Sequence, residues 1–201
     1  LHSDMERTGD LTCSNPLLNQ LHHNILWGLK GNFLDVPTDC PQRDERLGWT
    51  GDAQIFCRTA CYLMNTYTFY KKWLHDVEVD QTPEGGVPHV VPNIEEGKTD
   101  GNWLLSQGPH SAAAWADVAV IVPWTLYLMY GDKKILQVQY ESMRGWIEFM
   151  RRHSEDYIWN YKLQFGDWVA LDADVYGIFC IFHRIVCKNI PDSPERRCQR
   201  I

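Results

Sequence analysis

Apolar residues recur three and four positions apart along much of the chain, which is the spacing of one face of an α-helix. The first such stretch ends at Gly31-Asn32; Ser14 can cap its start, and Pro16 suits its first turn. Four later stretches show the same spacing, and they lie at about residues 52–63, 69–77, 112–130 and 133–153. The pattern therefore predicts five amphipathic helices.

Two long segments interrupt these helices. Residues 35–52 are charged and broken by Pro and Gly, and residues 82–111 hold many Gly and Pro, so both predict loops. Strand signals are few, with weak alternation at residues 87–91 and 157–165. Helices joined in turn by short connections and long loops are typical of a toroid of helical hairpins. Periodicity alone does not separate such a toroid from an ordinary bundle.

The pattern changes near the C-terminal end. The apolar residues within positions 174–201 show no helical period, and the segment ends in a basic stretch broken by Pro. We interpret residues 1–173 as part of one domain, and residues 174–201 as a divergent tail or a segment from another reading frame. The sequence begins with Leu1 rather than Met, which suggests a fragment.

Composition narrows the class of protein. The 201 residues are 44% hydrophobic, enough for a sizeable core, and the net charge of −7 argues against a nucleic-acid partner. No apolar run reaches the roughly 18 residues of a membrane-spanning helix, so we expect no membrane partner. The seven cysteines show no metal-binding spacing and are expected to be mostly buried apolar residues. Their odd number slightly favours a cytoplasmic location, although secretion remains an alternative.

The charged loop reads DVPTDCPQRDERLGWTGD. Glycoside hydrolysis requires two carboxyl groups, one protonated and one ionised. Glu45 lies beside Asp44 and near Gly48 and Trp49, and like charge with desolvation would favour the protonated form that a general acid needs. Arg43 and Arg46 would oppose this if either paired directly with Glu45, and the residues alone leave the balance open. The alternative is a solvated turn whose charges form surface pairs.

Other chemistry has less support. Asp39 and Asp52 are short carboxylates that could accept hydrogen bonds from sugar hydroxyls. His110 could touch a ligand, although a lone loop histidine is more often structural. No metal-ligand spacing, phosphate-binding glycine loop or serine-nucleophile motif is present, so no metal or cofactor is predicted. Cys40 is the only loop cysteine close to the charges.

The segment DVPTDCPQRDERLGWTGDAQ closely resembles the signature of bacterial inverting α-L-rhamnosidases. CSNPLLNQL, KWLHDV, WADVAVIVPWTLYLMYGD and FGDW agree with that family in order, so the likeness covers roughly residues 3–171. The resemblance implies an all-α fold, the (α/α)6 barrel of a six-hairpin glycosidase. Six hairpins need more helices than the five predicted here, so we expect an incomplete barrel.

The resemblance also implies roles for individual residues. Glu45 matches the general acid, and the remaining candidates match positions that contact the sugar. Asp39, Arg43, Trp49 and Asp52 match the rhamnose subsite directly; Trp103 and Trp168 match its aromatic residues more loosely; Asp117 and Asp167 are the weakest candidates. Either of those two aspartates could instead cap a helix or anchor a loop.

The expected function is inverting hydrolysis of terminal α-L-rhamnosyl residues from glycosides or polysaccharides. The family's base is a glutamate in the later half of the barrel, and it has no counterpart in these 201 residues. The chain alone is therefore expected to be inactive, with the rest of the catalytic domain absent. Alternatives are a six-hairpin glycosidase acting on another sugar and an inert carbohydrate-binding protein.

Overall fold

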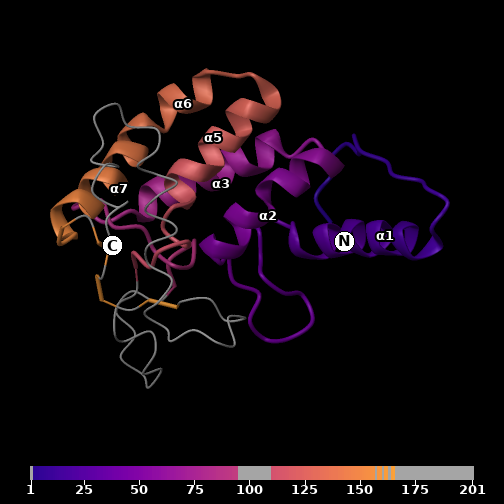
Figure 1. Ribbon diagram of the computed structural model, residues 1–201, viewed down its shortest axis with the longest axis horizontal. Coiled ribbons are helices and arrows are strands. Elements are labelled where there is room, and N and C mark those ends of the chain that lie inside the picture. Colours follow the sequence, from indigo (N-terminus) through magenta and orange to yellow (C-terminus); the bar gives the residue numbers. More distant parts are fainter. Residues whose placement is uncertain (1, 95–109, 157, 160, 163, 166–201) are drawn as a thin grey trace.

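The computed structural model describes residues 2–94, 110–156, 158–159, 161–162 and 164–165. These residues form helices and connecting segments, with isolated β-bridges but no extended strand (Figure 1). The helices are α1 (Pro16–Asn32), α2 (Thr50–Leu63), α3 (Tyr67–Asp80), α5 (Val118–Tyr130), α6 (Lys134–Val138) and α7 (Tyr140–His153). The prediction of an all-α chain is confirmed. None of the described helices has the length and hydropathy needed to cross a membrane.

Helices α1 and α2 start at slightly different residues from those predicted. Asn15, not Ser14, caps α1, because its side-chain oxygen accepts a hydrogen bond from the backbone N–H of Leu17 at 3.0 Å. The second helix begins at Thr50 and places Asp52 in its first turn. A carboxylate there interacts favourably with the positive end of the helix dipole.

The helix predicted at residues 112–130 was too long. Its α-helical part starts at Val118, and the Ala-rich residues before it form turns. Ser111 and Ala114 have φ values of 74° and 68°, which interrupt a right-handed helix. The backbone N–H groups of Ala112 and Ala113 donate instead to side chains of His89 and Gln164. These long-range contacts override the local helix propensity.

The helix predicted at residues 133–153 is two helices. Gln139 ends α6 with φ −89° and ψ 2°, and α7 starts at the next residue. The Gln139 side chain is buried, and its Nε2 lies 3.5 Å from Glu78 Oε2 on α3. A contact between distant parts of the chain thus accompanies the break.

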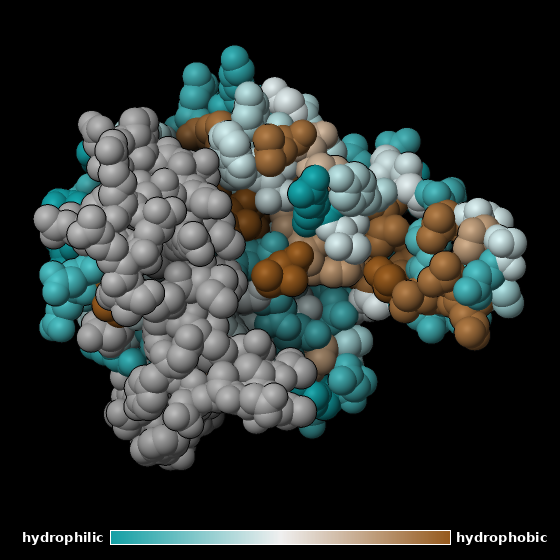
Figure 2. Space-filling view, in the orientation of Figure 1, coloured by the Kyte–Doolittle hydropathy of each residue, from teal (hydrophilic) through white to brown (hydrophobic). Residues whose placement is uncertain are grey.

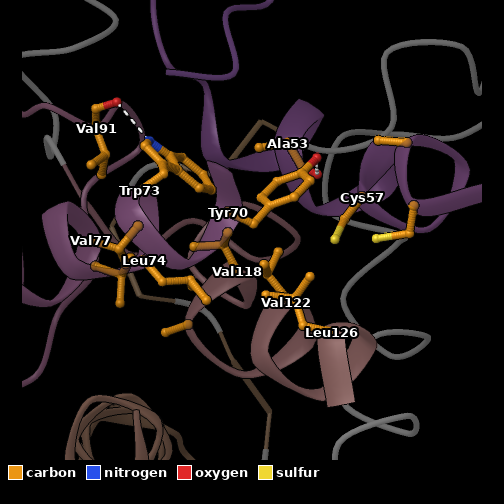
Figure 3. Close-up of a cluster of buried hydrophobic side chains, with 14 of the residues drawn as sticks. Ala53, Cys57, Tyr70, Trp73, Leu74, Val77, Val91, Val118, Val122 and Leu126 are labelled. Carbon is orange, nitrogen blue, oxygen red and sulfur yellow. Dashed lines mark hydrogen bonds between the residues drawn. The ribbon is translucent and has the colours of Figure 1, made fainter. Parts of the chain in front are cut away.

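The core lies where α2, α3 and α5 meet (Figure 3). Tyr70 and Trp73 of α3 are fully buried there, and their polar atoms are paired. Tyr70 donates to the carbonyl of Ala53 at 3.2 Å, and Trp73 Nε1 donates to the carbonyl of Val91 at 3.1 Å. The second bond fixes the segment after α3 against the core, beside the charged loop.

Helix α1 lies at one end of the molecule (Figure 1). It packs through Leu26 and Leu29, while Leu17, Leu21 and Trp27 are 77%, 53% and 57% exposed. Figure 2 shows this hydrophobic surface at the α1 end of the view. The fold therefore leaves one apolar helix face without a covering element among the described residues.

Candidate active site

The charged loop is closed by two hydrogen bonds between the same pair of residues. The backbone N–H of Asp39 donates to the carbonyl of Leu47 at 3.0 Å, and the N–H of Leu47 donates to Asp39 Oδ1 at 3.1 Å. Asp39 was predicted as a sugar ligand, and one of its oxygens already holds the loop. Its side chain is only 9% exposed.

The base of the loop is fixed to the segment after α3. The N–H of Val91 donates to the carbonyl of Gly48 at 2.9 Å, and the N–H of Thr50 donates to the carbonyl of His89 at 2.9 Å. A Cβ on Gly48 would lie 2.0 Å from the Val91 carbonyl oxygen. Glycine is required here because the two backbones approach so closely.

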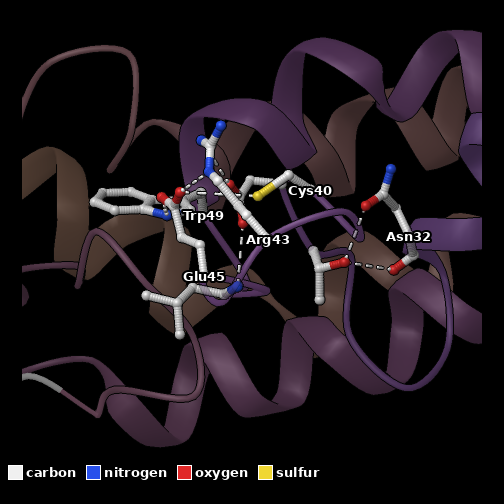
Figure 4. A network of polar contacts seen from close by, with 8 residues as sticks. Asn32, Cys40, Arg43, Glu45 and Trp49 are labelled. Atoms are coloured by element: carbon white, nitrogen blue, oxygen red, sulfur yellow. Dashed lines mark hydrogen bonds and ion pairs between the residues drawn. The ribbon is translucent and has the colours of Figure 1, made fainter.

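Glu45 lies at the centre of the loop's polar contacts (Figure 4). Its Oε1 accepts a hydrogen bond from Trp49 Nε1 at 3.0 Å, and its Oε2 accepts one from Arg43 Nε at 2.7 Å. The Glu45 side chain is 31% exposed. The carboxyl group is thus held from both oxygens and still reaches the surface, as a group that must meet a substrate requires.

Arg43 contacts two carboxylates. Besides the bond to Glu45, its Nη2 lies 3.9 Å from Asp39 Oδ2. The hydrogen bond to Glu45 is the main cause of a raised pKa for Arg43. The structure thus shows the direct Arg43–Glu45 pairing that the residues alone left open.

Cys40 fills the space beside these carboxylates. It is 6% exposed, and its Sγ lies 3.8 Å from Glu45 Oε2. A hydrogen bond to Asp39, followed by burial, raises the pKa of the Cys40 thiol. The sulfur and one oxygen each from Asp39 and Glu45 lie within 4.8 Å of one another. Among the described residues no other such cluster occurs, and here Arg43 supplies the positive charge.

Asp52 borders a cavity next to the loop. Its side chain is exposed, yet partial desolvation by the surrounding protein is the main cause of its raised pKa, and the negative charges of Asp39 and Glu45 add to it. The cavity has a volume of about 560 Å³ and lies between α1 and α2, with Asp39 and Asp52 among mostly apolar neighbours such as Phe56 and Trp115. Two of the predicted sugar ligands therefore face one hollow.

An aromatic cluster lies behind Trp49. The ring of Phe165 lies 5.9 Å from Trp49, 4.5 Å from Trp115 and 4.8 Å from His89, measured between centroids. Sequence reasoning did not single out Phe165 or His89, although Phe165 opens the FGDW motif. The cluster connects the loop to segments far away in the chain.

The other candidate residues from the sequence have no contact with Glu45 among the described residues, or lie outside those residues. Asp117 is buried; its Oδ1 accepts from Trp146 Nε1 at 3.0 Å, and its Oδ2 from the N–H of Ala114 at 2.9 Å. These bonds favour the loop-anchor alternative for Asp117. His110 is half-buried against Phe149 and bonded to Ser111, as a structural histidine would be. The remaining candidates Trp103, Asp167 and Trp168 lie outside the described residues.

Comparison with solved structures shows the same arrangement of helices. The structure of a Streptomyces avermitilis α-L-rhamnosidase complexed with L-rhamnose is 36% identical, with a TM-score of 0.81 over 93% of this chain and 17% of that one. A native rhamnosidase from Aspergillus terreus is 44% identical, with a TM-score of 0.73 over 86% of this chain and 19% of that one. The chain thus matches part of a much larger protein.

Comparison with protein sequences also finds α-L-rhamnosidases. An α-L-rhamnosidase from Alteromonas sp. (strain LOR) is 43% identical over 176 residues, which are 88% of this chain and 18% of the relative. Residues 6–178 match the model of the bacterial α-L-rhamnosidase six-hairpin glycosidase domain. The all-helical fold, the loop around Glu45 and these matches agree in one assignment: the chain belongs to the bacterial α-L-rhamnosidase six-hairpin glycosidase family, and it spans part of that domain.

Proposed function

We propose that the complete catalytic domain containing this chain hydrolyses terminal α-L-rhamnosyl groups with inversion, and that Glu45 is its general acid. The observation that carries the proposal is the position of Glu45, held from both oxygens and still exposed beside Asp39. The Streptomyces avermitilis relative was solved with L-rhamnose, which supports rhamnose as the sugar.

In this mechanism the carboxyl proton of Glu45 passes to the glycosidic oxygen as the bond from that oxygen to the anomeric carbon breaks. A water molecule adds to the opposite face of that carbon and gives its proton to a second carboxylate. The two carboxyl groups of an inverting enzyme are roughly 6.5–9.5 Å apart, which leaves room for the water. We assign that second carboxylate to a part of the domain outside these 201 residues.

Arg43 must change partner before Glu45 can carry a proton. In the structure its guanidinium lies 2.7 Å from Glu45, and the nearest alternative anion is Asp39 at 3.9 Å. A small movement toward Asp39 would release Glu45 and leave the positive charge paired. Arg43 then also has donors to offer to a sugar hydroxyl.

The remaining predicted residues bind the sugar in this proposal. Asp39 and Asp52 offer carboxylate oxygens to hydroxyl groups, and Trp49 offers an apolar ring while its Nε1 holds Glu45. Trp103, Asp167 and Trp168 stay in the proposed subsite on sequence grounds. We place Asp117 behind the site as an anchor, because both of its oxygens are already bonded.

The test is Glu45→Gln in the complete catalytic domain. Turnover of an alkyl α-L-rhamnoside should fall about 10²–10⁴-fold, whereas L-rhamnose binding by calorimetry should persist. A 4-nitrophenyl rhamnoside should lose less, because its leaving group needs little protonation. Proton NMR of the wild-type reaction should show β-L-rhamnose first. Asp44→Asn, at an exposed neighbour, is the matched control. Unchanged alkyl rhamnoside turnover in Glu45→Gln would exclude Glu45 as the acid.

A further inference from the structure

The proposed mechanism leaves Cys40 without a role. The residue is buried next to two carboxylates, although a small apolar side chain would fill the space without introducing a polar group. Its sulfur is free, as are those of Cys13, Cys57 and Cys61. A thiol beside two carboxylates can interact favourably with them only by donating its single proton in a hydrogen bond. The role of Cys40 therefore depends on where that proton lies.

The surroundings keep this thiol protonated. The hydrogen bond to Asp39 and burial both raise the pKa of Cys40, so the group is neither a nucleophile nor a third negative charge at neutral pH. Its sulfur also lies 3.8 Å from Glu45 Oε2, which places Glu45 and Asp39 within reach of the same S–H. Cys40 is therefore a neutral donor to carboxylates.

A thiol is a much weaker hydrogen-bond donor than a hydroxyl group or water. The buried sulfur of Cys40 is the neighbour of Glu45 Oε2 at 3.8 Å, and its weak hydrogen bond stabilises the carboxylate little. Arg43 already donates to this oxygen at 2.7 Å. Hydrogen bonds to a carboxylate stabilise its charged form, so a second strong donor at the same oxygen would work against the proton that a general acid must carry.

We propose that Cys40 is a positioning residue that excludes stronger hydrogen-bond donors from Glu45 and so lets this carboxyl group carry the proton for catalysis. This inference rests on the proposed role of Glu45. The charged groups that face the cluster are Asp39, Arg43 and Glu45 from the loop, and Asp52 from the first turn of α2. Cys40 is the neutral member of the group.

The test uses two substitutions in the complete catalytic domain. Cys40→Ser keeps the shape and strengthens the donor, and Cys40→Val removes the donor while still filling the space. A general acid must be protonated, so activity falls as pH rises through its titration. The alkaline limb of kcat/KM should move to lower pH in the Ser variant by about half to one pH unit and to higher pH in the Val variant. The acidic limb, set by the base, should stay.

Cys13→Ser is the matched control, because Cys13 is half-buried away from the loop and should leave both limbs unchanged. An unmoved alkaline limb in Cys40→Ser overturns the proposal, and so do shifts of the same sign in both Cys40 variants, which indicate a packing role. If Cys40→Val fails to fold, the Ser variant alone decides.

The two proposals can fail separately. Absence of wild-type turnover on any α-L-rhamnoside rejects the proposed function. In that case the Cys40 proposal is tested by carbon NMR titration of protein labelled with ¹³C-glutamate. The signal of Glu45 is identified by its absence from the spectrum of Glu45→Gln. A titration midpoint for Glu45 that is lower in Cys40→Ser than in wild type supports the positioning role, and an unchanged midpoint rejects it.

Discussion

The contacts of Glu45 show that its neighbours in the motif could be predicted from the sequence, whereas its pairing with Arg43 could not. The motif around it indicated a carboxyl group set among charges and a Trp. Whether Arg43 pairs with it depends on how the loop folds back, and that depends on the Asp39–Leu47 hydrogen bonds and on the anchor at Val91. The second anchor lies more than forty residues away, so local sequence carries little information about it.

His89 shows a similar limit at the scale of one residue. It is completely buried, its Nε2 accepts a hydrogen bond from the N–H of Ala112 at 3.0 Å, and its ring packs on Phe165. The sequence marked residues 87–91 only as a weak strand. The role of His89 as an acceptor for a distant turn follows from tertiary contacts, which a single sequence does not reveal.

Because His89 is buried, we expect the stability of the fold to decrease at acidic pH. Burial lowers its pKa to about 3, so the folded protein holds the neutral ring and the unfolded chain takes up the proton first. Its contribution to stability is present above the unfolded pKa of about 6.5 and is lost as pH falls toward 3. Between pH 6.5 and 5 the free energy of unfolding should drop by roughly 2 kcal/mol from this group.

The measurement is urea unfolding of the complete catalytic domain at both pH values, for wild type and His89→Gln. The Gln variant keeps an acceptor for Ala112 and cannot titrate, so its pH dependence should be smaller by that amount. His75→Gln, at an exposed histidine on α3, is the control. Equal pH dependence in wild type and His89→Gln would contradict the prediction.

At the scale of elements, sequence periodicity found the helical stretches and misjudged where they end. The errors at Val118 and Gln139 have the same cause, because side chains from distant segments pair with backbone or side-chain groups at those points. Neither break carries Gly or Pro, the residues that mark helix ends locally. Helix existence was therefore readable from the pattern, whereas helix limits depended on packing.

The junction between the loop and the segment after α3 gives a prediction of this scale. Gly48→Ala should force the loop away from Val91, because the new Cβ would lie 2.0 Å from its carbonyl oxygen. We expect thermal stability to fall by the equivalent of about 1–3 kcal/mol and rhamnosidase kcat to fall at least tenfold.

The control is Gly28→Ala on α1, where the Cβ would meet nothing within 4 Å. That substitution should raise stability by about 0.5–1 kcal/mol because it favours the helix and restricts the unfolded chain. Thermal unfolding and kcat of the complete catalytic domain check both variants. Wild-type stability and kcat in Gly48→Ala would show that the junction tolerates movement.

At the scale of the molecule, the exposed face of α1 matters most. Leu17, Leu21 and Trp27 are each more than half exposed, and all three lie on α1. Large apolar residues gathered on one exposed helix indicate a surface that another element or partner covers. The matched rhamnosidases are several times longer than this chain, so the remaining length includes ample material to cover that face. Periodicity predicted α1 as amphipathic, and its uncovered face is consistent with a partial domain.

A polypeptide of these 201 residues alone should therefore associate and should not turn over rhamnosides. Apolar burial drives association, and the proposed mechanism places its second carboxylate outside these residues. Sedimentation velocity should show species larger than the 23.4 kDa monomer. The double substitution Leu21→Gln and Trp27→Gln should shift the distribution toward monomer, with Leu128→Gln, on α5, as the control. A monodisperse monomer, or turnover comparable to that of a full-length relative, would sink the prediction.

The anchoring of the charged loop also bears on the order of events during protein synthesis. Every bond described around Glu45, and the anchor that holds its loop, comes from residues 39–91. In our proposal the second carboxylate belongs to a later part of the domain, which a ribosome delivers after residues 39–91. The proposed proton-donating side of the site can therefore take shape while the polypeptide is still growing, and the proposed water-activating side must wait for that later part.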